Sequence, residues 1–341
     1  MIQENFIKIY EESFKKNWEL PALTDYSKGT TFSFADVATE IARIHILFEE
    51  CQIRRGDKIA LIGKDSARWC IVRRGQRRFF LKEFLSPVYP AENANPVLRE
   101  KQLARCRRFE EKKRRLYSAM SCVIGDTLVP VTDFFRFGLH YYAVSEEIPE
   151  PRLTGESAVE TLPMEDKREI LLSLALCLQR LHLQGIVHAD LKPEHVLLRK
   201  GELGYEARLI DLDSGFLADD PPAPGGDTEG DPVYLAPETF LRMAGEQADV
   251  GPAIDTFAFG AILHRMWTGA LPETDAPYLY ETALEGRPIR VSAQLPPAYE
   301  QAVRRMLDAE PTHRPSDGEL VKLFSQPFET EERPPLPGEP L

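Results

Sequence analysis

The spacing of hydrophobic residues predicts an alternation of short strands and longer helices. Apolar residues recur every three or four positions, as in amphipathic helices, at residues 3–16, 34–51, 98–120 and 165–184. Short apolar runs typical of strands lie at residues 58–62, 69–72, 79–85, 140–148, 195–199 and 207–212. Helix and loop patterns then continue to about residue 325. This order predicts an α+β fold, with a small strand-rich lobe followed by a larger helical lobe.

Composition narrows the class of protein. The 341 residues are 43% hydrophobic, which is enough for a substantial core, and the net charge of −12 disfavours a general nucleic-acid binder. No apolar run is long enough for a membrane span, and the acidic N-terminus lacks the apolar region of a secretory signal. Five cysteines without CxxC spacing indicate free thiols. We therefore expect a cytoplasmic globular protein without a nucleic-acid partner.

The composition changes near residue 72. Residues 1–72 contain 6 Lys, 4 Arg and one proline, whereas residues 73–341 contain 8 Lys, 24 Arg and 26 prolines. A natural domain border or a gene fusion would each produce this change. At the other end, residues 327–341 are rich in proline and charge, which predicts a disordered tail.

The sharpest chemical pattern combines two short acidic segments. Asp190 and Lys192 lie in the run HADLKPEH between a helix and an apolar strand, and Asp211 follows 21 residues after Asp190 in LIDLD. A loop carboxylate can orient a hydroxyl nucleophile, and a neighbouring ammonium group can neutralise a transferred phosphate. A second carboxylate at a strand end can hold a divalent ion that bridges nucleotide phosphates. Alone, either aspartate would be more typical of a turn or a cap.

Five motifs in order make the chain resemble the protein kinases, in their bacterial eukaryotic-like Ser/Thr branch. The motifs are HADLKPEH, LIDLD, YLAPE, DVGPAIDTFAFGAILHRMWTG and PTHRP. The resemblance covers about residues 73–325 and implies a two-lobed kinase-like fold. Its N-lobe would be residues 73–148, with strands within 58–72 as a potential completion, and its C-lobe residues 149–326.

The resemblance implies transfer of the ATP γ-phosphoryl group to protein Ser or Thr, with Mg²⁺ as the metal. Asp190 would orient the hydroxyl, Lys192 would steady the phosphoryl group and Asp211 would hold the metal ion. Four further residues would have structural roles. His188 and Asp255 would brace the catalytic loop, and Arg314 would pair with Glu238.

Within FFLK, Lys82 would contact the nucleotide phosphates, although a solvated strand lysine is the alternative. Its helix partner would be Glu110, which lies seven residues after Leu103 and is preferred to Glu111 and Glu100. Glu110 could instead form a surface pair with an arginine four residues later. Glu146 and Ile148 fall where the adenine-binding hinge would lie.

Several positions depart from the family pattern. His195 replaces the metal-binding asparagine, which makes Mn²⁺ an alternative to Mg²⁺, and Asp213 replaces a glycine and could supply a replacement ligand. Ala189 replaces the arginine that reads a phosphorylated activation segment, and Asp231 replaces a threonine. The family has a glycine-rich loop on the two strands before Lys82, whereas the stretch IALIGKDSARWCIV at residues 59–72 has a single glycine, Gly63.

Residues 1–72 resemble instead the start of long-chain acyl-CoA synthetases. The matching stretches are TFSFADV at residues 31–37 and GDKIAL at residues 56–61. The adenylating residues of that family lie far downstream and have no equivalent here. We therefore expect residues 1–72 to be a non-catalytic fragment joined to the kinase-like region.

Two other functions compete with protein phosphorylation. A pseudokinase that acts as a nucleotide-binding or scaffold module is favoured by the missing glycine loop, His195 and Asp231. A small-molecule phosphotransferase shares the two aspartates, but YLAPE, Asp255 and Arg314 are typical of a protein-substrate platform. The sequence does not identify a protein substrate or binding partner, and Thr228 is a phosphorylation candidate on weak grounds.

Overall fold

The computed structural model of the chain describes most of the residues between 13 and 328. The described ranges are 13–25, 30–50, 67–74, 76–91, 95–123, 125, 127–148, 159, 161–201, 204–226 and 230–328. The chain divides into two compact units, residues 1–64 and 65–341.

The first unit contains a strand pair and a helix. Strands β1 (Pro21–Asp25) and β2 (Thr30–Ser33) are antiparallel, and helix α2 (Phe34–Glu50) follows directly. Ser33 and Asp36 cap the N-terminus of α2. The backbone N–H of each residue donates a hydrogen bond to the side chain of the other. Helix α2 confirms the helix predicted at 34–51. The strand predicted at 58–62 lies outside the described residues, as does most of the helix predicted at 3–16.

A four-stranded antiparallel sheet begins the second unit. Its strands are β3 (Ala67–Arg74), β4 (Arg77–Phe84), β5 (Val131–Phe137) and β6 (His140–Glu146), in the order β3-β4-β6-β5. Strand β3 includes the RWCIV run and pairs with β4 along its whole length, with Trp69 opposite Lys82. Residues 67–72 therefore form part of the same sheet as Lys82, although we had expected the N-terminal fragment to extend to residue 72. Gly63 lies outside the described residues.

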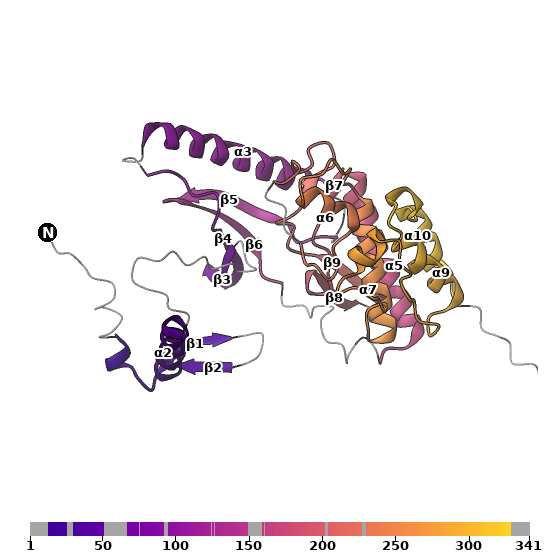
Figure 1. The fold of residues 1–341 in the computed structure, drawn as a ribbon. Helices are drawn as coiled ribbons and strands as arrows, with labels where there is room; N and C mark the ends of the chain where they lie inside the picture. Colours follow the sequence, from indigo (N-terminus) through magenta and orange to yellow (C-terminus); the bar gives the residue numbers. More distant parts are fainter. Residues whose placement is uncertain are drawn as a thin grey trace, which may run out of the picture. The chain divides into compact units, whose positions relative to one another are not determined.

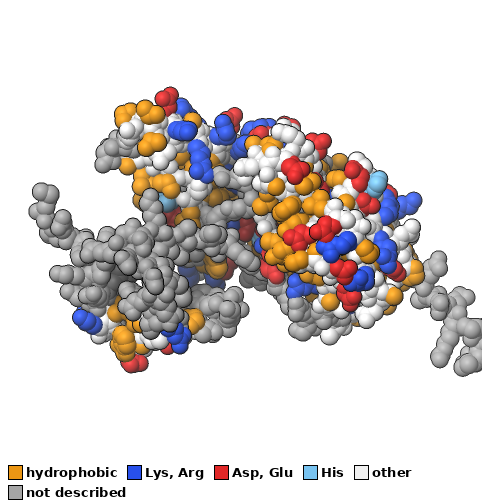
Figure 2. All heavy atoms as spheres, in the orientation of Figure 1, with side chains coloured by type: hydrophobic (Ala, Val, Ile, Leu, Met, Phe, Trp, Pro, Cys, Tyr) orange, Lys and Arg blue, Asp and Glu red, His pale blue; other side chains and the backbone are white. Residues whose placement is uncertain are grey.

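Helix α3 (Pro96–Met120) lies against this sheet (Figure 1). The Asn95 side chain accepts hydrogen bonds from the N–H groups of Val97 and Leu98, which caps the first turn. Cys106 is buried with Phe84, Phe134 and Tyr141 of the strands, because apolar residues recur along one side of the helix. Much of the rest of the surface of α3 is basic, and Figure 2 shows Lys and Arg side chains along this part of the molecule.

The rest of the second unit is mainly helical. Its elements in chain order are α5 (Met164–Leu183), β7 (Ile186–Val187), η1 (Pro193–His195), β8 (Val196–Gly201), β9 (Gly204–Leu209), β10 (Phe216–Leu217), α6 (Pro237–Met243), α7 (Ala253–Thr268), α8 (Leu279–Leu284), α9 (Pro297–Met306), η2 (Pro311–His313) and α10 (Asp317–Ser325). Strands β8 and β9 pair with each other, as do β7 and β10. The sheet and this helical region form the two-lobed kinase fold that the resemblance implies.

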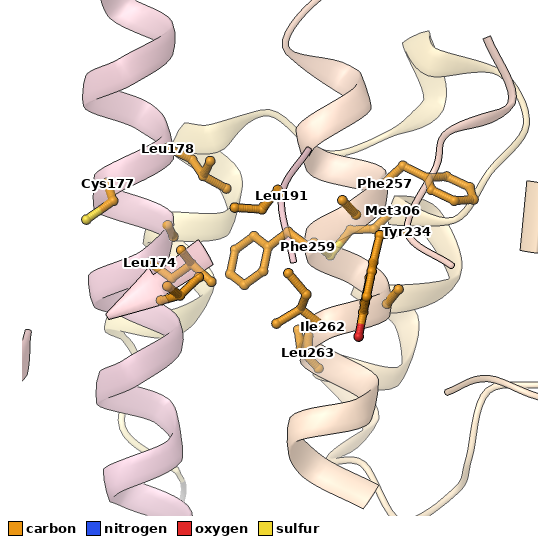
Figure 3. Packing of buried hydrophobic residues seen from close by; sticks show 14 of the residues in the cluster. Leu174, Cys177, Leu178, Leu191, Tyr234, Phe257, Phe259, Ile262, Leu263 and Met306 are labelled. Atoms are coloured by element: carbon orange, nitrogen blue, oxygen red, sulfur yellow. The ribbon is translucent and has the colours of Figure 1, made fainter. Parts of the chain in front are cut away.

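The largest core joins α5 to α7. Leu174 and Leu178 of α5 face Phe259 of α7 in Figure 3, and all three side chains are almost completely buried. Leu191 of the HADLKPEH loop belongs to the same core. Burying each such side chain contributes about 1.5–3 kcal/mol to the free energy of folding. The core therefore supports the loop that contains Leu191.

Among the described residues, no helix is both long and apolar enough to cross a membrane. The tail predicted at 327–341 lies outside the described residues from residue 329 onward.

Candidate active site

The loop between β7 and β8 carries Asp190 and is fixed by a buried carboxylate of α7. Asp255 accepts hydrogen bonds from the backbone N–H groups of His188, at 2.7 Å, and Ala189, at 2.9 Å. His188 is fully buried, and its Nε2 lies 3.1 Å from the carbonyl oxygen of Ile210. Ala189 has φ = +65°, a left-handed conformation that non-glycine residues adopt only at an energetic cost. Tertiary contacts therefore impose the loop conformation.

Asp190 and Lys192 lie together at the end of this loop, with Asp231 beside them. Lys192 Nζ lies 3.3 Å from Asp190 Oδ2 and 3.7 Å from Asp231 Oδ2. The backbone N–H of Asp231 donates to Asp190 Oδ1 at 2.9 Å. Asp231 thus still contacts both residues without the threonine hydroxyl that is usual in the family. A small pocket next to them is lined by Asp190, Asp231, Tyr234 and Thr239, among others.

Asp211 lies just after β9 and forms an ion pair with Lys82 of β4. Lys82 Nζ is 2.8 Å from Asp211 Oδ1, and Asp211 has φ = +61°. Burial acts to raise the pKa of Asp211, but the Lys82 ammonium group outweighs it and lowers this pKa to about 2. The carboxylate therefore stays ionised throughout the physiological pH range, as a ligand for a hard cation must.

His195 lies between the two aspartates. Its Nδ1 is 2.8 Å from the carbonyl oxygen of Asp190, and its Nε2 is 3.5 Å from Asp211 Oδ2. Burial is the largest influence on His195 and lowers its pKa, which favours the neutral ring at pH 7. A carbonyl oxygen only accepts hydrogen bonds, so Nδ1 carries the proton and Nε2 presents a lone pair toward Asp211. Nε2 and the Asp211 carboxylate are thus oriented to share a cation.

Glu110 does not lie beside Lys82. It forms an ion pair with Arg114 at 2.9 Å, the surface pair that the sequence left as the alternative. The buried position on this part of α3 is Lys113 instead, whose side chain lies against the Phe84 and Phe109 rings. The expected pairing of Glu110 with Lys82 is not the one that this structure has, because Arg114, one turn further along the helix, pairs with the Glu110 carboxylate. Cys106, seven residues before Lys113, is buried as well.

Asp213 supplies a second carboxylate for Lys82. Its Oδ2 lies 2.5 Å from Lys82 Nζ, and its backbone carbonyl oxygen accepts a hydrogen bond from Lys113 Nζ at 2.5 Å. Burial disfavours the charged form of Lys82, but Asp213 and then Asp211 outweigh this effect and raise its pKa. Lys82 is therefore protonated at neutral pH and balanced by two carboxylates.

The segment predicted as the hinge follows β6. Glu146 lies at the exposed end of that strand and pairs with Arg77 at 3.2 Å. The next residue, Glu147, donates its backbone N–H to the carbonyl oxygen of Arg78 at 3.1 Å. Ile148 is partly buried, and the residues from 149 to 158 lie outside the described part of the chain. Glu146 and Ile148 thus lie at the end of the inner strand β6, and within the described part of the chain neither is an ion-pair partner of Lys82.

Glu238 and Arg314 form a buried bidentate ion pair. Arg314 Nη1 and Nη2 donate to the two carboxylate oxygens of Glu238 at 2.6 and 2.8 Å. The pair joins the start of α6 to the segment after η2. Arg314 also donates to the carbonyl oxygen of Ala253 in α7, so this pair and Asp255 fix neighbouring parts of the same helix.

Lys113 was not predicted as a site residue, although its position in the sequence indicates that it is buried. The residue lies four positions after Phe109 and three before Leu116, which places it in the apolar stripe of α3. A lysine in such a stripe indicates a buried cation that needs a partner.

Comparison with known proteins agrees with this geometry. Residues 97–328 match the model of the protein kinase domain. The chain is 33% identical over 171 residues to the serine/threonine-protein kinase pkn2 of Myxococcus xanthus, covering 48% of this chain and 19% of that protein. It is 30% identical over 211 residues to the inactive serine/threonine-protein kinase PLK5 of Mus musculus, covering 58% and 32%.

A third relative is the hormonally up-regulated neu tumor-associated kinase homolog A of Xenopus laevis. It is 26% identical over 246 residues, which cover 69% of this chain and 34% of that protein. The chain thus spans about a fifth to a third of the length of these relatives. The matched domain covers more than half of the chain and contains every catalytic-loop contact described above, and so the chain belongs to the protein kinase family.

Proposed function

We propose that this kinase-like domain transfers the γ-phosphoryl group of ATP to a Ser or Thr hydroxyl of a protein. The observation that carries the proposal is the pairing of Lys82 with Asp211 at 2.8 Å, next to Asp190 and Lys192. Phosphoryl transfer depends mainly on positioning and on stabilising charge, and these four side chains supply both.

Each of these residues has a distinct role in the proposal. Asp190 orients the acceptor hydroxyl and receives its proton late in transfer, while Lys192 neutralises charge on the transferred group. Lys82 holds the α and β phosphates. A metal–nucleotide complex supplies the phosphoryl group and the charge that activates it.

The residues fit a divalent ion bound together with nucleotide phosphates. The described residues contain no cluster of three or more His, Cys, Asp and Glu side chains arranged for a metal ion. Magnesium in nucleotide sites commonly uses only one or two carboxylates plus phosphate oxygens, and Asp211 could provide such a carboxylate. The Nε2 lone pair of His195 adds a ligand that suits Mn²⁺ better than Mg²⁺.

Thermal unfolding with and without nucleotide tests the proposal first. A ligand at 100 times its dissociation constant stabilises a folded protein by about 2.7 kcal/mol. We expect ATP with Mg²⁺ or Mn²⁺ to raise the melting temperature, and Lys82→Ala to abolish the shift. Lys101→Ala, at an exposed position of α3, is the matched control. The absence of a shift with millimolar ATP would contradict nucleotide binding.

Phosphate transfer itself requires a separate variant. Asp190→Asn should abolish transfer from radiolabelled ATP to a mixture of model proteins, because the hydroxyl loses its orienting carboxylate. The same variant should retain the nucleotide-dependent thermal shift. Unchanged phosphorylation by Asp190→Asn would rule out the role assigned to this residue.

A pseudokinase is the second candidate, and Lys113 is the observation that favours it. A buried lysine, not a glutamate, lies on the inner side of α3, and Lys82 is balanced by two carboxylates without any nucleotide. Such a site could serve as a stable scaffold. A thermal shift without transfer to any model protein, or no shift at all, would favour this function.

We also propose that the N-terminal part derives from an acyl-CoA-synthetase-like start without catalytic capacity. The support is the TFSFADV resemblance, which spans β2 and the first turn of α2. The chain should then form no acyl-adenylate from ATP and palmitate in a pyrophosphate-release assay. Pyrophosphate release above the level of a heat-denatured control would contradict this proposal.

A further inference from the structure

Lys82 has two carboxylate partners. Only one of them remains available to Lys82 when a metal–nucleotide complex is bound. The Lys82 side chain is 15% exposed, with Nζ 2.8 Å from Asp211 and 2.5 Å from Asp213. In the proposed function, Asp211 faces the metal ion. A divalent cation draws that carboxylate far more strongly than an ammonium group does. Asp213 is then the partner left to hold Lys82.

The glutamates of α3 are not positioned for this task. Glu110 is paired with Arg114 one helical turn away, while Glu100 and Glu111 lie on the exposed side of the helix.

Asp213 is itself held by α3. Lys113 Nζ donates to its carbonyl oxygen at 2.5 Å, and the same Nζ lies 5.4 to 6.0 Å from the ring centroids of Phe84, Phe109 and Tyr117. The aromatic faces stabilise the ammonium group further. Asp213 therefore contacts β4 through its carboxylate and α3 through its backbone.

Ion pairs continue this attachment along the same segment. Lys112 lies 3.3 Å from Asp220, and Arg115 lies 3.1 Å from Asp219. The basic side of α3 thus follows residues 213–220. These two side chains have acidic partners within the chain.

We infer that Asp213 is the positioning partner of Lys82 and that Lys113 fixes α3 to Asp213. Together they replace a direct ion pair between Lys82 and a helix glutamate. The inference deepens the proposed function and rests on it for the role of Lys82 toward nucleotide. The coupling between the three residues is a property of the nucleotide-free protein and is measurable on its own.

A double-mutant cycle on thermal unfolding of the full chain tests the coupling. Lys82→Met and Asp213→Asn should each lower the melting temperature, and the double variant should melt no lower than the worse single variant, because contacting residues are non-additive. Lys82→Met combined with Glu110→Gln should give additive shifts. Additive shifts for Lys82 and Asp213 would overturn the inference. If Asp213→Asn does not fold, Asp213→Glu keeps the carboxylate and should melt close to the wild type.

Affinity for a fluorescent ATP analogue with Mn²⁺ provides the second readout. Asp213→Asn should weaken binding about tenfold, since removing one partner of a largely buried ion pair leaves the other charge poorly compensated. The exposed control Asp133→Asn should have no effect. Lys113→Glu combined with Asp213→Asn should recover part of the loss, because a helix carboxylate then becomes available to Lys82. Equal affinities of Asp213→Asn and Asp133→Asn would overturn the inference.

Failure of the proposed function gives a different result. If the wild type binds no nucleotide but the unfolding cycle still shows coupling, the proposed function fails and the inference stands. If the wild type binds nucleotide and the cycle is additive, the proposed function stands and the inference fails.

Discussion

At the scale of single residues, the site combines conformational strain with fixed protonation. Ala189 and Asp211 both have left-handed backbones, and each such conformation costs about 1–3 kcal/mol for a non-glycine residue. Asp211 has a pKa of about 2, and the ring of His195 is neutral at pH 7 because burial lowers its pKa. Together they present one charged oxygen ligand and one neutral nitrogen ligand.

This ligand pair predicts a metal preference. With ATP present, Mn²⁺ should give a larger thermal shift than Mg²⁺, since imidazole nitrogen suits Mn²⁺ better. His195→Asn replaces the ring by an amide oxygen and should reverse the order. The melting temperature of the variant with each metal–ATP complex is the measurement. An unchanged preference would mean that His195 is not a ligand, and the exposed His313→Asn is the control.

At the scale of elements, Asp255 connects three parts of the C-terminal region. Its carboxylate accepts the two loop N–H groups and also lies 3.0 Å from Nε2 of His182 in α5. The other ring nitrogen of His182 lies 2.8 Å from Asp317 of α10. The ring therefore bridges two carboxylates, as a satisfied buried histidine and not as a metal ligand.

The bridge predicts a pH dependence of stability. Burial lowers the pKa of His182, but hydrogen bonds to Asp255 and Asp317 outweigh it and raise this pKa from 6.5 to about 9. A pKa raised on folding means that the contribution is complete below pH 6.5 and is lost as the pH rises through 9. The loss amounts to about 3 kcal/mol. Urea unfolding between pH 6 and pH 10 should show it, and His182→Asn should flatten this profile. If the stability of the variant depends on pH as steeply as that of the wild type, the pH dependence comes from groups other than His182.

The ion pair between α6 and the segment after η2 predicts a large loss of stability. Arg314→Met would leave the Glu238 carboxylate buried without its partner, which costs about 3–5 kcal/mol. Denaturant unfolding measures this loss. The exposed pair Arg304–Glu300 offers a control, because Arg304→Met should cost less than about 1 kcal/mol. Similar losses in the two variants would contradict this argument.

Motif order predicted much of this architecture, because each motif identifies one partner of a contact between residues far apart in the sequence. Glu238 with Arg314, and Asp255 with the loop backbone, lie where the motifs imply. The helix face of α3 was harder to predict. Glu110 and Lys113 lie three residues apart on the same side of the helix, and tertiary contacts decide that Lys113 is buried while Glu110 pairs with Arg114. The second carboxylate on Lys82 depends on the tertiary position of Asp213, which local patterns do not encode.

At the scale of the whole molecule, the boundary of the second unit lies before β3. The unit begins at residue 65, and β3 covers the outer edge of β4, which carries Lys82. Trp69 of β3 stacks on Phe80 of β4 with ring centroids 5.3 Å apart. The strand is therefore part of the sheet that supports Lys82.

Two truncated chains test this boundary. A chain of residues 65–328 should unfold cooperatively, whereas residues 77–328 should melt at a lower temperature and aggregate, because β4 becomes an unprotected edge strand. Circular dichroism melting and light scattering distinguish the two chains. Equal melting temperatures would show that β3 contributes nothing to the stability of the sheet.

The position of Lys192 between two carboxylates has a consequence for the end of a catalytic cycle. Asp190 and Asp231 together carry one more negative charge than the single lysine balances. A phosphorylated side chain adds about 1.5 to 2 negative charges where a neutral hydroxyl stood before. If the chain transfers phosphate as proposed, this local charge repels the product more than the substrate. Departure of the phosphorylated protein would then be fast, and turnover would not be limited by release of that product.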